Sequence, residues 1–255
     1  MATGYKRLIS PEFRVTTENY EITSGMEMEF FSSRESRSDW CRVELSPQLQ
    51  GIISYVDMEK AEVELGYGDE YDTLLDGYCR RAEGDYWKEI IIRDAMIKIE
   101  RTEIKGTFIS CTLQDIVRYV LAQAGIERYQ LDDAEYGKKD TFVVNRMNGI
   151  QAIAQAGNAW GADNDFFFQN GVFYWGCRPE QKNVYILEES ENILSLKKYG
   201  DLYEIETFGV PWIHHSQEVE VLHSKHSGIV KVEKVIIKSD AKGYTRMYIY
   251  FKGGR

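Results

Sequence analysis

The sequence predicts an α+β protein, mainly β, in which two β-domains flank a small α/β domain with two helices and a β-hairpin. Two observations predict this order: residues 1–107 and 181–255 alternate apolar with charged side chains, and residues 108–180 show helical spacing instead. Period-two alternation is typical of strands with one buried face, and several short strands of this kind form a barrel or a sandwich. We therefore expect domains at residues 1–107, 108–180 and 181–255.

The first β-domain contains several clear strand patterns. The apolar run at residues 89–93 predicts a strand buried on both faces, and another strand is expected at 71–78, before a loop around Gly84 and Asp85. Alternation predicts strands with one buried face at residues 27–31, 40–45, 60–65 and 96–100.

The first helix of the insert is predicted over residues 112–124. Thr112 can cap its first turn together with Asp115, where the helix dipole favours an acid, and Gly125 can take the left-handed conformation that ends a helix. Spacing of three and four places one apolar stripe on this helix, formed by Leu113, Ile116, Val117, Val120, Leu121 and Ala124.

The second helix is predicted to begin near Asn145 or Asn148 and to end at Gly161. It carries apolar residues inward, and its alanines and Gly157 allow close packing against a neighbour.

An aromatic hairpin follows this helix. Residues 166–169 and 172–175 meet across Asn170-Gly171, a turn signal that is strong because both residues must tolerate positive φ. We expect the aromatic side chains to pack in a core or against another subunit, although aromatic faces also stack on sugars or bases.

The C-terminal domain returns to β patterns. Its last two strands are joined by residues 240–243, which have the composition of a hairpin turn. The predicted strands lie at residues 183–187, 202–206, 218–222, 229–237 and 245–251.

Composition limits the class of protein. A chain of 255 residues that is 43% hydrophobic can bury sizeable cores. It has no run of about 18 apolar residues, and its first residues lack the apolar segment of a secretion signal, so we expect a soluble protein assembled in the cytoplasm, without a membrane partner. A net charge of −10 from scattered acids argues against binding nucleic acid.

The four cysteines show no metal-ligand or redox spacing. They lie more than 30 residues apart, mostly among apolar or aromatic neighbours, and we interpret them as buried free thiols. They are Cys41, Cys79, Cys111 and Cys177.

All four histidines lie close together in the sequence, as zinc ligands can. Zinc sites usually add cysteine or carboxylate at short fixed spacing, and adjacent strand residues point to opposite faces. We therefore favour a surface or interface cluster over a metal site. The histidines are His214, His215, His223 and His226.

The sequence predicts no catalytic residues and no cofactor. Glu27 with Glu29, and Glu62 with Glu64, share a strand face and could imitate a glycosidase pair, but acids on one strand face are commonly solvated. No nucleophile elbow or cysteine-protease signature is present, and the glycines at 66 and 68 lack the rest of a dinucleotide fingerprint.

The order of these patterns resembles the baseplate hub proteins of contractile phage tails and of phage-tail-like bacteriocins (tailocins, R-type bacteriocins), the family of late control protein D. Residues 210–213, Val-Pro-Trp-Ile, followed by the alternating residues 218–221, are similar to the family's proline-containing entry into its last barrel strands. The resemblance covers most of the chain and depends on segments 61–67, 74–78, 92–96, 112–126 and 160–171.

This resemblance implies two tube-like β-barrel domains flanking the α/β insert. It also implies a homotrimer that adapts the hexameric tail tube to the trimeric central spike, with baseplate wedge and tape-measure proteins as further partners. Because the chain ends at Arg255, we expect a separate protein to supply the piercing tip. The candidate interface residues are Trp212, His214 and His215.

Two other functions remain open at this stage. A tail-associated cell-wall hydrolase would require a catalytic acid or nucleophile in a cleft, and a glycan-binding tail module would use exposed aromatic faces.

Overall fold

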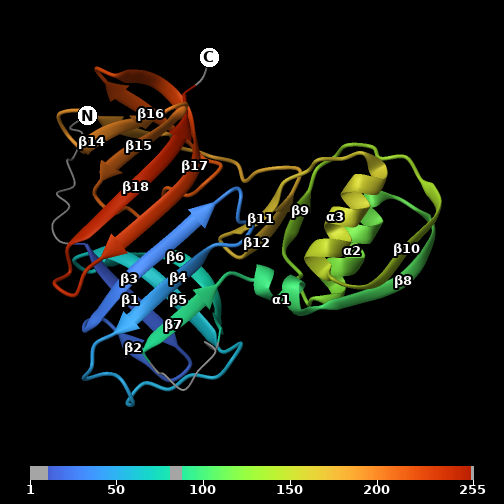
Figure 1. Ribbon diagram of the computed structural model, residues 1–255, viewed down its shortest axis with the longest axis horizontal. Coiled ribbons are helices and arrows are strands. Elements are labelled where there is room, and N and C mark those ends of the chain that lie inside the picture. Colours follow the sequence, from blue (N-terminus) through green and yellow to red (C-terminus); the bar gives the residue numbers. More distant parts are fainter. Residues whose placement is uncertain (1–10, 81–87, 254–255) are drawn as a thin grey trace. The chain divides into compact units, whose positions relative to one another are not determined.

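The computed structural model describes residues 11–80 and 88–253, and the chain divides into two compact units, each considered by itself (Figure 1). Unit 1 comprises residues 1–93 and 181–255, and unit 2 comprises residues 94–180. Each unit has a hydrophobic core of its own. The loop expected around Gly84 and Asp85 lies outside the described residues. None of the helices in the described part of the chain has the length and apolar character that a membrane span requires.

Unit 1 is built from strands of both ends of the chain. Its strands are β1 (Glu12–Thr17), β2 (Glu21–Ile22), β3 (Met26–Ser33), β4 (Trp40–Leu45), β5 (Lys60–Tyr67), β6 (Glu70–Arg80), β7 (Glu89–Arg93), β13 (Tyr185–Glu188), β14 (Ile193–Tyr199), β15 (Leu202–Thr207), β16 (Glu218–His223), β17 (His226–Ser239) and β18 (Thr245–Lys252).

These strands form one 13-stranded sheet in the described residues, with the order β14-β15-β18-β17-β3-β4-β7-β6-β5-β1-β2. The strands β13 and β16 branch from this path beside β17, and β14 and β2 are its two ends, so the path does not close into a barrel. The antiparallel pair β17–β3 joins the N-terminal and C-terminal segments, with Ile236 opposite Phe31 and Ile237 opposite Phe30. The two β segments therefore belong to one compact unit.

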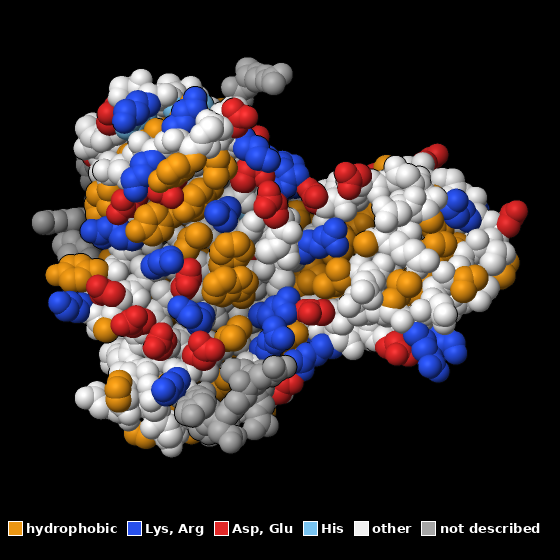
Figure 2. Space-filling model, viewed as in Figure 1, with side chains coloured by type: hydrophobic (Ala, Val, Ile, Leu, Met, Phe, Trp, Pro, Cys, Tyr) orange, Lys and Arg blue, Asp and Glu red, His pale blue; other side chains and the backbone are white. Residues whose placement is uncertain are grey.

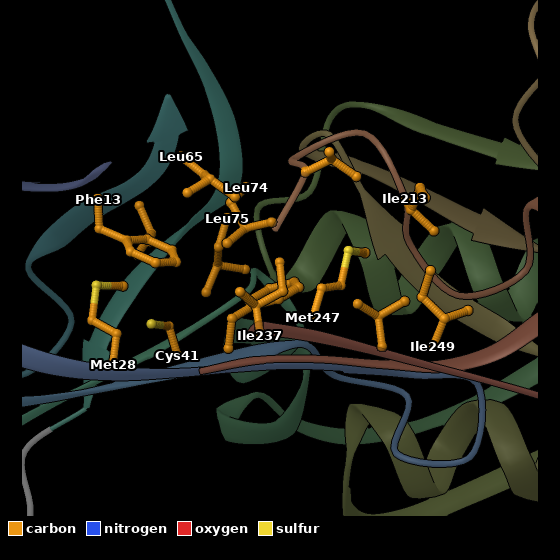
Figure 3. Close-up of a cluster of buried hydrophobic side chains, with 14 of the residues drawn as sticks. Phe13, Met28, Cys41, Leu65, Leu74, Leu75, Ile213, Ile237, Met247 and Ile249 are labelled. Carbon is orange, nitrogen blue, oxygen red and sulfur yellow. The ribbon is translucent and has the colours of Figure 1, made fainter. Parts of the chain in front are cut away.

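The core of unit 1 is shared by both segments. Figure 3 shows side chains such as Phe13 and Leu65 from the N-terminal strands in the same cluster as Ile237, Met247 and Ile249 from β17 and β18. Ile237, Met247 and Ile249 are completely buried. Burial of such apolar side chains is the main term that stabilises a fold, so neither segment has a complete core alone.

Strand β7 differs from its sequence prediction. Residues 89–93 were expected to be buried on both faces, but only Ile90 and Ile92 are buried, while Glu89, Ile91 and Arg93 lie on the partly exposed face. An isolated apolar run does not show whether one or both faces of its sheet are covered, and here only one face of β7 is fully covered.

Residues 96–100 form a helix, so the predicted strand there is wrong. Helix α1 (Met96–Arg101) begins after Asp94, whose carboxylate accepts a hydrogen bond from the Met96 backbone N–H at 3.0 Å. The helix buries Ile97 and Ile99. A five-residue apolar pattern is too short to distinguish period two from helical spacing.

Unit 2 contains the three helices and a set of short strands. Besides α1, its elements are β8 (Glu103–Cys111), α2 (Leu113–Gln123), β9 (Tyr129–Leu131), β10 (Lys139–Asn148), α3 (Gly149–Trp160), β11 (Phe166–Gln169) and β12 (Val172–Trp175). Strands β8 and β10 form a two-stranded antiparallel sheet, and β11, β12 and β9 form a three-stranded sheet in which β9 is parallel to β12.

Both predicted helices of unit 2 are confirmed with their caps. Thr112 and Asp115 form a capping box on α2, and Gly125 has a φ of +67°. Helix α3 is capped by Asn148, the second of the two predicted starting positions, and ends at Gly161 in the left-handed conformation. Helix caps can be predicted from the sequence because the side chains that hydrogen-bond the free backbone groups at a helix end lie within a few residues of that end.

The predicted hairpin is also confirmed. Strands β11 and β12 pair from Phe166 opposite Trp175 to Gln169 opposite Val172, and both turn residues have positive φ. The aromatic side chains of β11 are buried, and Trp175 is 1% exposed in the core of unit 2.

The cysteines of the chain are free thiols, as predicted. The predicted burial is confirmed for Cys41, Cys79 and Cys111 but is wrong for Cys177, which is only partly buried. Burial raises the pKa of the Cys79 thiol to about 12, which keeps it protonated at neutral pH.

Candidate interaction surface

The candidate interface residues lie on the segment 208–216, which we call the strap. It follows β15, and of its residues only Phe208 and Trp212 are exposed. Val210 and Ile213 enter the core of unit 1. Gly209 lies so close to the sheet that a Cβ there would be 2.8 Å from the methyl group of Thr245, so the backbone of the strap is packed tightly while two large aromatic rings remain outside.

Trp212 is held in a defined orientation. Its side chain is 43% exposed, and its indole Nε1 donates a hydrogen bond to Oδ2 of Asp72 on β6 at 2.8 Å. The ring of Tyr185 lies 6.4 Å away, centroid to centroid. An exposed tryptophan whose rotamer is already fixed loses little conformational entropy on binding, which suits it to an interface.

His214 is a buried residue of the strap. Its ring meets Phe30 edge to face at 6.0 Å, and its backbone N–H donates to Oε1 of Gln217 at 2.9 Å. Burial lowers the pKa of His214 to about 4, against the smaller opposing effect of a hydrogen bond with the backbone of Pro211. The ring is therefore neutral at physiological pH and acts as part of the core.

His215 connects the strap to the N-terminal strands. Its side chain is 2% exposed, its Nε2 lies 3.8 Å from Oδ1 of Asp39, and its Nδ1 lies 2.9 Å from the hydroxyl of Ser216. Its backbone N–H donates to the hydroxyl of Ser32 on β3 at 3.4 Å. In the single chain, His214 and His215 position the strap from inside, and Trp212 is the member of the predicted trio that reaches the surface.

The other two histidines, His223 and His226, contact different residues from those around His214 and His215. His223 approaches Glu189 at 3.4 Å, and the ring of His226 lies 5.0 Å from the rings of both Tyr203 and Phe251. In residues 11–80 and 88–253, no group of three or more metal-binding side chains is positioned to hold an ion. Closeness in sequence therefore does not bring the four histidines together as ligands.

Three members of the two acidic pairs, Glu29, Glu62 and Glu64, take part in contacts on the sheet surface. Glu64 forms an ion pair with Arg14 at 2.5 Å, and Thr73 donates a hydrogen bond to Glu62 at 2.5 Å. On β3, Glu29 pairs with Arg42 at 3.7 Å and with Lys238 at 3.0 Å. These contacts join neighbouring strands, which is a structural role.

Sequence reasoning missed Phe208 and the contacts that hold Trp212. An aromatic residue beside a glycine gives no sign of its exposure, and the hydrogen bond from Trp212 to Asp72 joins residues that are 140 positions apart. Only the proline-containing pattern around Trp212 offered a local signal.

Comparison with known proteins gives a structural likeness only. No family model matches the sequence, and no curated protein sequence matches it. Among solved structures, the 43 kDa tail protein of prophage MuSo2 from Shewanella oneidensis superposes with a TM-score of 0.73 at 11% identity, covering 95% of this chain and 98% of that one.

A tail protein from Neisseria meningitidis gives a TM-score of 0.71 at 11% identity, covering 96% of this chain and 97% of that chain. The chain has the fold of phage tail proteins. The c3393 protein of E. coli, described as a type VI secretion component with similarity to T4 bacteriophage tail proteins, gives 0.66 at 10% identity, covering 94% of this chain and 77% of that one. Both β segments and the helical insert are thus shared with tail and secretion-system proteins.

Proposed function

We propose that this chain is a structural baseplate hub protein of a contractile phage tail or tailocin. In this role it forms a homotrimeric ring at the distal end of the tail tube and adapts the hexameric tube to the trimeric central spike. Its partners are then the tail tube protein and the spike protein, with baseplate wedge proteins and, at the central channel, the tape-measure protein as further partners. It acts without catalysis.

The observation that carries this proposal is the likeness to tail proteins over the full length of both chains, with a TM-score of 0.73 and coverage of 95% and 98%. A likeness that covers 95% of this chain includes residues of both unit 1 and unit 2. We also propose that the two β segments act as the two tube-like, barrel-type domains of such a hub.

Features of unit 1 fit an assembly role. The strands β13, β14 and β2 are edge strands in the described sheet, and unpaired edges are available to neighbouring subunits. The strap presents Trp212 in a fixed orientation. Closed symmetry gives each such patch a defined partner. We therefore assign Trp212 to a subunit interface, with His214 and His215 as the buried residues that anchor the strap to the core.

The oligomeric state in the presence of tube and spike tests the proposal. Native mass spectrometry of the coexpressed proteins should show a species with three copies of this 29.6 kDa chain bound to the spike. Trp212→Ala should reduce the trimer while circular dichroism stays unchanged. Tyr129→Ala, which removes another exposed aromatic side chain but in unit 2, should leave the trimer intact.

A location test complements the mass measurement. Electron microscopy of tail particles carrying a tagged copy of this protein should place the label at the distal end of the tube. Label distributed along the tail, a chain that stays monomeric with tube and spike present, or cell-wall lysis in a zymogram of the purified protein would each overturn the proposal.

A further inference from the structure

The outer face of strands β18, β17, β3 and β4 carries a continuous apolar row. In the cross-strand register, Ile236 lies opposite Tyr248 on one side and opposite Phe31 on the other, and Phe31 lies opposite Trp40. The rings of Phe31 and Trp40 stack at 5.2 Å with an angle of 12°. All four side chains are half-buried and point away from the core, because their neighbours Val235, Ile237, Phe30 and Cys41 fill it.

The two ends of this row have unused polar atoms. The indole N–H of Trp40 and the hydroxyl of Tyr248 make no hydrogen bond with any described residue. Tryptophan and tyrosine combine a large apolar surface with one polar atom, and they are enriched among the residues that dominate binding at protein interfaces. Water satisfies these atoms in the free chain, and a binding partner can replace it.

A row of carboxylates lies on the same face, separated from the apolar row by the paired side chains of Lys238, Glu29 and Arg42. Glu27 on β3 is directly opposite Glu44 on β4, and Glu44 is directly opposite Glu89 on β7. Glu27 and Glu44 are exposed and have no ion pair or hydrogen bond within the described residues. Like charges directly opposite one another destabilise a strand pair, so a cation placed between these side chains would stabilise it.

A depression of about 490 Å³ lies between Tyr248, at one end of the apolar row, and the carboxylates Glu27 and Glu44. Its lining also contains the cations Arg42, Lys238 and Arg246. Figure 2 looks onto this side of unit 1, where hydrophobic side chains lie among acidic and basic ones. An apolar strip bordered by charged residues is the usual composition of a protein interface.

We propose that this face is a docking surface for a different protein, whose contacting segment places apolar side chains on the row and lysine or arginine over Glu27 and Glu44. A second copy of this chain fits the face less well, because its cations here are already paired. Arg42 and Lys238 share Glu29, and Arg246 lies 3.6 Å from Glu206. This docking surface is separate from Trp212 and does not depend on the trimer.

A synthetic peptide that alternates lysine with valine is the probe, and the same peptide with glutamate in place of lysine is its control. The reporter is the indole N–H signal of Trp40 in a ¹⁵N-labelled full-length protein, assigned by its loss in Trp40→Phe. The lysine peptide should shift this signal in a saturable way, and the glutamate peptide should not.

Charge reversal at the acidic row tests the chemistry. The double variant Glu27→Lys, Glu44→Lys should bind the lysine peptide about tenfold more weakly or worse. The matched double variant Glu188→Lys, Glu220→Lys has the same net charge but changes β13 and β16, so it should bind like the original protein. Circular dichroism of both variants controls for folding.

Three outcomes would overturn the proposal. One is a Trp40 signal that the lysine peptide does not move. Another is an equal loss of binding in both double variants, which would indicate an effect of net charge alone. The third is a dimer of this chain, seen by sedimentation, that dissociates when Glu27 and Glu44 are reversed. Because the trimer test uses Trp212 and a mass measurement, its failure is distinguishable from any of these.

Discussion

Replacing Ile237 with alanine should destabilise the N-terminal and C-terminal β segments together. Ile237 lies on β17, is 0% exposed and is paired with Phe30 of β3. At about 0.8 kcal/mol for each buried carbon, loss of the carbons beyond Cβ removes roughly 2–3 kcal/mol of transfer free energy. The cavity that remains raises the expected loss in the free energy of unfolding to about 3–4 kcal/mol.

Chemical denaturation and hydrogen exchange read out this prediction. Circular dichroism in urea gives the change in unfolding free energy, and exchange measured by mass spectrometry shows which strands lose protection. Strand β5, which is far from β17 in sequence but shares its core, should lose protection together with β17 and β18. The control is Ile229→Ala on the same strand, where the side chain is 63% exposed and the expected change is within about 0.5 kcal/mol.

Either of two results would refute the reasoning. If Ile237→Ala left the protection of β5 unchanged while β17 and β18 opened, the two segments would unfold as independent domains. If Ile229→Ala cost as much as Ile237→Ala, burial in the shared core would not be the source of the effect.

Three further predictions concern single residues. His214 should make the free energy of unfolding pH-dependent, because its folded pKa of about 4 lies below the ordinary value of 6.5 and only the unfolded state binds a proton between these values. Stability should therefore fall as the pH drops from about 6.5 to about 4. Denaturation of His214→Gln at several pH values should show that this slope is lost. Gly149→Ala should cost unit 2 about 1–3 kcal/mol despite the better helix propensity of alanine, because its Cβ would lie 2.7 Å from the Ile99 carbonyl oxygen, whereas Gly137→Ala has open space and should change the melting temperature little. Thr112→Ala should remove the cap of α2 and cost about 1 kcal/mol, and Thr112→Ser, which keeps the hydroxyl, should restore it in the same thermal assay.

Features that depend on a few neighbouring residues could be predicted from the sequence. The capping box of Thr112 and the Asn170-Gly171 turn are complete within their own segments, and the structure confirms both. The helix at 96–101 was missed because its short apolar pattern fits a strand equally well. Its helical state depends on the hydrogen bond from the Met96 backbone to the Asp94 carboxylate and on burial of Ile99 in the core of unit 2.

Features that depend on distant pairing could not be predicted. The register of β17 against β3 joins residues about 200 positions apart and depends on the whole sheet. For the same reason the burial of His214 and His215 was not visible, since it is created by Phe30 and Asp39 from the other end of the chain. Trp212 is exposed, as an interface residue must be. Its role in a subunit interface is a proposal.

The two faces of the β17–β3–β4 sheet have separable functions because neighbouring residues on a strand point to opposite sides. Cys41 is completely buried in the core, and the adjacent Trp40 lies on the outer row. Substitutions that keep the volume of inward-facing residues therefore preserve the scaffold, while the outer-facing residues can change with the partner. A protein that binds different neighbours benefits from this separation of the two faces. Its outward-facing residues can change with the partner, while the core that holds its strand edges and strap in place stays the same.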